Sequence, residues 1–187
     1  MLIATERLRG EVAYREAEIA ERLGQLAAQV TNDMRHLDPV VVPMHRGGRE
    51  TSDELVRQFG LLQEPFNPPV APMKVSRYDN GQAREPRVER PVEVDVAGRV
   101  VLLTDGIVEG GHSLDVAAAD LRERQALKIV RLVLVKRASK GAMVDYVGFH
   151  YEGEEWLEGY GEDDGTGQGR DRRDIIVSFR QPSDLVA

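Results

Sequence analysis

The chain has 187 residues, of which 25 are Lys or Arg and 32 are Asp or Glu, so its formal net charge is −7. Its 41% hydrophobic and 30% charged residues are typical of a globular protein with a substantial core. The absence of cysteine excludes disulfides, cysteine-ligated metal sites and thiol nucleophiles. The negative charge argues against nucleic acid as a partner, and no apolar run approaches the roughly 20 residues of a membrane helix. Because the N-terminus also lacks a secretory signal, we expect a single cytoplasmic domain over residues 1–187.

Helices and apolar strands alternate from the start of the chain. Residues 14–35 carry apolar side chains at helical spacing and predict an amphipathic helix. The β-branched run 39–43 predicts a buried strand. A helix capped by Thr51 or Ser52 is expected next, ending near Gly60.

Residues 60–98 give weaker signals. A proline-rich stretch excludes a helix over 63–73, and residues 73–76 predict a weak strand. Residues 77–91 are polar and contain the tight-turn pair Asn80 and Gly81. This segment therefore predicts a mobile, hairpin-like loop.

The strongest predicted strand covers residues 99–104 and ends at Asp105. A glycine-containing loop follows, then a helix over 113–126 capped by Ser113, then an apolar strand over 129–135. Apolar strands that alternate with helices favour an α/β fold, in which a mostly parallel twisted sheet is flanked by helices.

The last part of the chain has a different character. Residues 146–149 and 175–179 predict short strands, and residues 161–173 between them are rich in glycine and charge. We therefore divide the domain into a core over about 14–140 and a small irregular cap, or hood, over about 141–187.

Chemistry is concentrated in residues 100–114, where a buried strand ends in an acid and a helix opens after glycines. Such a strand–loop–helix unit points backbone N–H groups into the crevice at the carboxyl end of the sheet, where they bind phosphate. Gly110 and Gly111 would let the backbone approach a ligand. The carboxylates of Asp105 and Glu109 could hold ribose hydroxyls, Mg²⁺ or a proton in transfer.

The same loop has three other interpretations. The P-loop pattern is absent. A nucleophile elbow is disfavoured, because Asp115 stands where the pattern requires glycine and Ser113 lies far beyond the strand end. A plain connection, with Ser113 as a helix cap, fits the pattern about as well as a phosphate site.

The segment 100–114 resembles the signature with which type I phosphoribosyltransferases bind phosphoribosyl pyrophosphate (PRPP). Nearly the whole chain is similar to hypoxanthine-guanine phosphoribosyltransferases, in which comparable segments occur in the same order. These segments are REAEIAERLGQLAAQVT (15–31), VVVPMHRGG (40–48), VSRYDNG (75–81), LVLVKR (132–137) with DYVGF (145–149), and EWLEGYGEDD (155–164).

The resemblance implies a role for each matching residue. Glu109 would exchange a proton with N7 of the purine, and Arg77 and Tyr78 would belong to a mobile loop that closes over the reacting centre. The residues implied in binding PRPP and its phosphates are Asp105, Gly106, Gly110, Gly111, His112, Ser113, Arg46, Gly47, Gly48 and Arg170. Lys136, Trp156 and Leu157 would bind the purine, Asp163 and Asp105 would bind Mg²⁺, and a cis peptide bond would lie at His45–Arg46.

Four positions depart from the family pattern. Gly106 replaces the second acid of the pair that holds the ribose, Glu109 replaces an aspartate, Gly110 replaces a threonine and Arg77 replaces a serine. We therefore expect either a Mg²⁺-dependent transferase for hypoxanthine or guanine, with xanthine as a further candidate, or a weak or inactive relative that binds PRPP or a purine nucleotide as an effector. A transferase for another base is a third alternative, and the resemblance also implies a homodimer or homotetramer.

Overall fold

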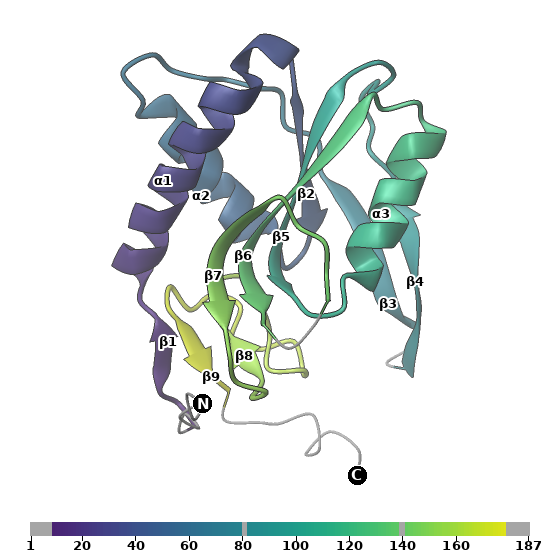
Figure 1. Ribbon diagram of the computed structural model, residues 1–187. Helices are drawn as coiled ribbons and strands as arrows, with labels where there is room; N and C mark the ends of the chain where they lie inside the picture. Colours follow the sequence, from purple (N-terminus) through teal and green to yellow (C-terminus); the bar gives the residue numbers. More distant parts are fainter. Residues whose placement is uncertain (1–8, 80–81, 139–140, 179–187) are drawn as a thin grey trace.

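The computed structural model of the protein describes residues 9–79, 82–138 and 141–178, with only the backbone at 77–79 and 82–84. A six-stranded sheet lies at its centre (Figure 1). In spatial order the strands are β4 (Gln82–Arg90), β3 (Met73–Asp79), β2 (Val40–His45), β5 (Val100–Val108), β6 (Lys128–Arg137) and β7 (Tyr146–Tyr151). All neighbouring strands run parallel except β3 and β4, so the mostly parallel sheet is confirmed.

Helices cover both faces of this sheet (Figure 1). One face carries α1 (Glu16–Met34) and α2 (Arg49–Gly60), and the other carries α3 (His112–Glu123). A short 3-10 helix, η1 (Arg35–Leu37), follows α1. The predicted α/β architecture is therefore confirmed.

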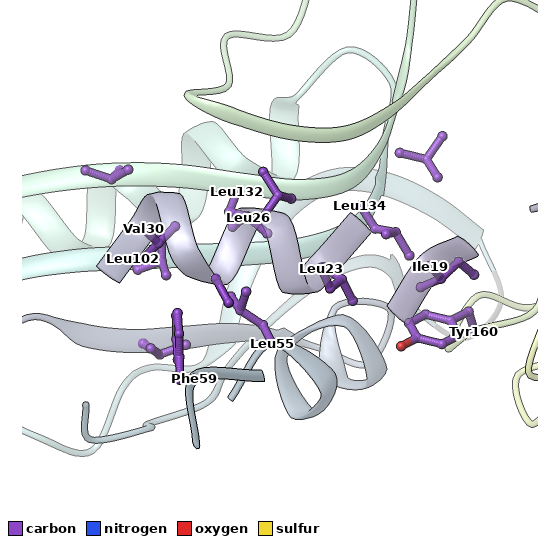
Figure 2. Packing of buried hydrophobic residues seen from close by; sticks show 14 of the residues in the cluster. Ile19, Leu23, Leu26, Val30, Leu55, Phe59, Leu102, Leu132, Leu134 and Tyr160 are labelled. Carbon is purple, nitrogen blue, oxygen red and sulfur yellow. The ribbon is translucent and has the colours of Figure 1, made fainter. Parts of the chain in front are cut away.

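Alternate residues of the central strands feed two separate cores. In β5, Val100 and Leu102 pack in the core beneath α1 and α2, whereas Val101 and Leu103 pack in the core beneath α3. Successive side chains of a strand point to opposite faces, so a strand covered on both sides needs an unbroken apolar run. Figure 2 shows the first core, where side chains of α1 and α2 meet those of β5 and β6.

A second, antiparallel sheet forms the hood, which we define as β1 (Val12–Tyr14), β8 (Leu157–Glu158), β9 (Ile175–Val177) and residues 152–174. Its strand order is β1-β9-β8, so it joins the beginning of the chain to the last described residues. Figure 1 shows the hood beyond the carboxyl ends of the parallel strands. Residues 146–149, which were predicted within the cap, instead lie in β7 of the main sheet, because Phe149 and Tyr146 pack against the first core.

The strand predicted to end at Asp105 continues to Val108, so that prediction was wrong. Ile107 and Val108 still pair with β6, because the acid and Gly106 occupy strand positions without interrupting the backbone ladder. Because the strand is longer, only three residues lie between the end of β5 and the start of α3.

Glycines, rather than hydroxyl residues, precede α2 and α3. Gly48 caps α2 at Arg49, and Gly111, with a φ of 81°, caps α3 at His112. The sequence predicted Thr51 or Ser52 as the cap of α2 and Ser113 as the cap of α3. Both predictions were wrong, because these residues lie inside the helices. The buried Ser52 hydroxyl donates back to the Gly48 carbonyl at 2.9 Å, which satisfies it within the helix.

The segment predicted as a hairpin-like loop is an antiparallel pair of strands. Ser76 pairs with Arg87 and Val75 with Val88, so β3 and β4 form an arm at one edge of the sheet. The predicted turn at Asn80 and Gly81 lies outside the described residues. Among the described residues, no helix has both the length and the apolar character needed to cross a membrane.

The packing of α1 predicts a large difference between two leucine variants. Leu23 is fully buried in the first core, so Leu23→Ala is expected to lower the free energy of unfolding by about 2–5 kcal/mol. Leu61 is 64% exposed, so Leu61→Ala is expected to change it by less than about 0.5 kcal/mol. Urea unfolding followed by circular dichroism measures both, and similar costs would contradict the packing described here.

Candidate active site

A cleft of about 550 Å³ opens where the parallel strands end beneath the hood. The end of β5, the loop after it and the first turn of α3 line one part of the cleft. Trp156, Leu157, Glu162, Asp163 and Arg170 of the hood line the remainder, together with Arg137 of β6. The carboxyl edge of a parallel sheet is the usual location of ligand sites in α/β folds.

The N-terminus of α3 provides an anion site in this cleft. Gly110, Gly111, His112 and Ser113 all line it. The first N–H groups of a helix have no partner within the helix and, with the helix dipole, favour a phosphate. The left-handed conformation of Gly111 turns the chain from the loop into the helix, which places these N–H groups at the cleft wall.

A second hollow of about 650 Å³ adjoins the turn between β2 and α2. The His45–Arg46 peptide bond at this turn is cis, as the resemblance implied. Arg46, Arg49 and Arg170 line the hollow, which gives it a positive wall suited to pyrophosphate. Burial, aided by the charges of Arg90 and Arg49, lowers the pKa of His45, which disfavours the charged form of its imidazole.

Arg170 lies between the two hollows. Its guanidinium donates to the Asp163 carboxylate and to the Gly161 carbonyl. Asp163 Oδ1 also accepts from the Gly165 N–H at 2.8 Å. The backbone carbonyl of Asp163 accepts from the Trp156 indole N–H at 2.7 Å. These contacts join the predicted metal ligand, the predicted base-stacking residue and the predicted pyrophosphate arginine in one network.

Arg137 is a cleft residue that the sequence analysis missed. It is 3% exposed and donates to Glu109 Oε1 at 2.8 Å, to the Gly153 carbonyl at 2.9 Å and to the Glu155 carbonyl at 2.7 Å. It thereby ties the predicted proton-transfer group to the hood. The predicted purine ligand Lys136, its neighbour in β6, is half-buried and is not among the residues that line the cleft.

Glu162 was also missed. Its carboxylate reaches from the hood to the end of β5, where Oε1 accepts from the Ile107 N–H at 3.3 Å. Burial raises the pKa of Glu162, and burial with the charge of Glu162 raises the pKa of Asp105. Two features of the sequence could have identified Glu162: it precedes the predicted metal ligand Asp163, and Gly106 leaves the acidic pair without its second member.

Most of the predicted site residues therefore come together around two adjoining hollows. Gly47 and Gly48 lie in the turn beside the second hollow, and Gly106 lies next to Asp105 in β5. The side chains of Arg77 and Tyr78 lie outside the described residues, although their backbone belongs to β3. Within the part of the chain that the structure describes, no group of three or more acidic or histidine side chains forms a ready metal cage.

The contacts of Arg137 predict unequal costs for two glutamine variants. Arg137→Gln is expected to destabilise the protein by about 1–3 kcal/mol, because it leaves two hood carbonyls without their donor in a buried setting. Glu109→Gln is the comparison and is expected to cost less than Arg137→Gln, because the glutamine oxygen can still accept from Arg137 and the Glu109 side chain is 46% exposed. Urea unfolding measures both, and equal costs would show that Arg137 matters only as the partner of Glu109.

Comparison with known proteins finds relatives over most of the chain. Hypoxanthine phosphoribosyltransferase of Escherichia coli strain K12 is 29% identical over 160 residues, which cover 82% of this chain and 86% of that protein. The bifunctional protein TilS/HprT of Listeria innocua is also 29% identical over 160 residues, but the chain spans only 24% of its length.

The solved structures show the same fold. A hypoxanthine phosphoribosyltransferase from Staphylococcus aureus superposes with a TM-score of 0.79 at 21% identity, over 95% of this chain and 94% of that one. The family model described as the phosphoribosyl transferase domain matches residues 14–164. This match covers most of the chain and includes the sheet, the α3 loop and the acidic part of the hood, so the chain belongs to the phosphoribosyl transferase family.

Proposed function

We propose that the protein transfers the 5-phosphoribosyl group from PRPP to hypoxanthine or guanine, with xanthine as a further candidate, and releases pyrophosphate. Family membership supports the phosphoribosyl transfer, and relatives named hypoxanthine phosphoribosyltransferase support a 6-oxopurine as acceptor. The observation that carries the proposal is a single cleft lined by both the N-terminus of α3 and Trp156. One wall suits a phosphate and the other suits a flat aromatic base.

The dimensions of the two hollows support this assignment. A volume of about 550 Å³ lies within the range of small-molecule sites and accommodates a nucleoside monophosphate. The 5-phosphate would lie on the N–H groups of the α3 first turn. The pyrophosphate would lie in the adjoining hollow, against Arg46, Gly47, Gly48 and Arg170.

Recognition of the base is assigned to three residues. Trp156 stacks on the purine, and the backbone of Leu157 contacts it. Lys136, whose side chain does not line the cleft, is proposed to reach the exocyclic oxygen at C6 of the purine. Arg137 is not assigned to the base, because its guanidinium is already directed at Glu109 and at two hood carbonyls. Its role is to hold Glu109 against the cleft.

The chain's own groups account for the proton and charge changes of the transfer. The bond between C1 of the ribose and the pyrophosphate oxygen breaks, and a bond from C1 to N9 of the purine forms. Glu109 takes the proton that the purine releases, through N7. The carboxylate of Asp105 stabilises the positive charge that develops on the ribose. Arg77 and Tyr78, near the end of β3, are proposed to close over the reacting centre and exclude water.

Magnesium is the proposed cofactor, and the residues present fit it. Mg²⁺ is usually held by one or two carboxylates together with substrate phosphates, so a complete protein cage is not required. Asp105 and Asp163 line the cleft, and Glu50 Oε2 beside the second hollow is buried with no hydrogen-bond partner among the described residues. When bound, the ion neutralises charge on the departing pyrophosphate. A cytoplasmic location stays a prediction from the sequence, and a homodimer or homotetramer stays a prediction from the resemblance.

A panel of bases tests the proposed function directly. The protein is incubated with PRPP, Mg²⁺ and hypoxanthine, guanine, xanthine or adenine, and nucleotide formation is followed by chromatography. We expect product with hypoxanthine or guanine and none with adenine. If no base gives product while PRPP or a nucleotide still binds, the changes at Gly106, Glu109 and Gly110 have made the protein an effector-binding member of the family.

Glu109 provides a second test. Removing a proton-transfer group typically costs about 10²- to 10⁴-fold in rate, so Glu109→Gln is expected to lower kcat by that factor. Glu109→Asp keeps the carboxylate and is expected to retain more activity than Glu109→Gln. The control is Glu123→Gln, at the opposite end of α3, which should leave kcat unchanged. Unchanged turnover in Glu109→Gln would remove Glu109 from the proposed mechanism.

A further inference from the structure

The carboxylate of Glu162 fills a space that two glycines leave open. A Cβ built on Gly106 would lie 2.5 Å from Glu162 Oε1, and one built on Gly47 would lie still closer to the same oxygen. These glycines belong to β5 and to the turn between β2 and α2, whereas Glu162 belongs to the hood. Three separate segments thus meet at one carboxylate, and it can be there only because both glycines lack side chains.

Glu162 shares this position with Asp105. Both side chains line the cleft, and the charge of Glu162 is near enough to raise the pKa of Asp105. Asp105 Oδ1 accepts from the Gly106 N–H at 2.9 Å, and Glu162 accepts from the Ile107 N–H. Within the described part of the chain, neither carboxylate forms an ion pair, because the nearby Arg170 is paired with Asp163. The cleft wall therefore carries two adjacent acids, each held by one backbone N–H and neither in an ion pair among the described residues.

We propose that Glu162 supplies the second carboxylate that binds the ribose hydroxyls of PRPP, in place of the acid missing at Gly106. The inference rests on the proposed function, since the ribose comes from PRPP or from the nucleotide product. Asp105 is delivered by the sheet and Glu162 by the hood, and the two carboxylates face the ligand as a pair. The glycine at 106 is then a requirement of this arrangement rather than the loss of a ligand.

The backbone around Glu162 holds it in this position. Gly161 has a φ of 94°, and a Cβ on it would lie 2.6 Å from the Gly47 carbonyl, so the hood approaches the turn backbone to backbone. The Gly159 N–H donates to the Glu162 carbonyl at 2.9 Å, and the Glu162 N–H donates to the Gly159 carbonyl at 3.1 Å. The carboxylate of the neighbouring Asp163 faces Arg170 and the Gly165 N–H, whereas that of Glu162 reaches the end of β5 beside Asp105.

The test compares ligands that differ only in the ribose hydroxyls. Binding of GMP and of 2′,3′-dideoxy-GMP is measured by calorimetry for the wild type and for Glu162→Gln, which keeps the shape of the side chain. Loss of a charge-assisted hydrogen bond corresponds to about a tenfold to hundredfold change, so Glu162→Gln is expected to weaken GMP by that factor. It is expected to leave the affinity for dideoxy-GMP and for magnesium pyrophosphate unchanged.

The matched control is Glu158→Gln, which removes a buried hood acid paired with Arg172 and Ser178. It is expected to lower the melting temperature and leave the affinity for GMP unchanged. Equal weakening of GMP and dideoxy-GMP by Glu162→Gln would show a purely structural role and would overturn the inference. If the wild type binds neither PRPP nor GMP, the proposed function is wrong, and the inference, which depends on it, is wrong as well.

A second variant moves the acid back to the sheet. Glu162→Ala is expected to lose the preference for GMP over dideoxy-GMP, and Gly106→Asp combined with Glu162→Ala is expected to regain it. The aspartate requires a small shift of the Gly47 carbonyl, which would lie 2.9 Å from its Cβ, and the melting temperature reports whether the fold accepts that shift. A folded double variant without the preference would contradict the exchange of one acid for the other.

Discussion

The pairing of β5 with β2 on one side and β6 on the other is the interaction on which the rest of the protein depends. Both neighbours run parallel to β5, so all three strands deliver their carboxyl ends to one edge. The alternating residues of β5 hold α1 and α2 on one face and α3 on the other. The strand's last residues then reach the cleft as Asp105, Ile107 and Val108. A single buried strand thus fixes both the layers of the fold and the chemistry at its edge.

Close backbone contact is the second requirement of the site. A Cβ on Gly48 would lie 2.8 Å from Asp105 Cα, and one on Gly161 would lie 2.6 Å from the Gly47 carbonyl. At these two points the turn approaches the sheet and the hood backbone to backbone. That contact brings acids from different segments into one space, and it explains why glycines gather where a binding site would otherwise be expected to carry more functional side chains.

The fold was largely predictable from the sequence, because strands buried on two faces need unbroken apolar runs and α1 shows its buried face at helical spacing. The end of β5 was not predictable, because pairing with β6 extends the strand past Asp105. The cap of α3 was not predictable either, because the left-handed Gly111 begins the helix before Ser113. Trp156 and Asp163 were identified by resemblance. Arg137 and Glu162 were missed because their partners come from other segments of the chain.

The inclusion of β1 in the hood couples the start of the chain to the substrate-binding edge. The Gly10 N–H donates to the Val177 carbonyl at 2.7 Å, the Val177 N–H donates to the Glu11 carbonyl at 2.8 Å, and the Glu16 N–H donates to Asp174 Oδ1 at 2.7 Å. A movement of the hood away from the sheet would have to carry these residues with it and pull on the first turn of α1. The first strand therefore acts as a tether that resists lifting of the hood away from the sheet.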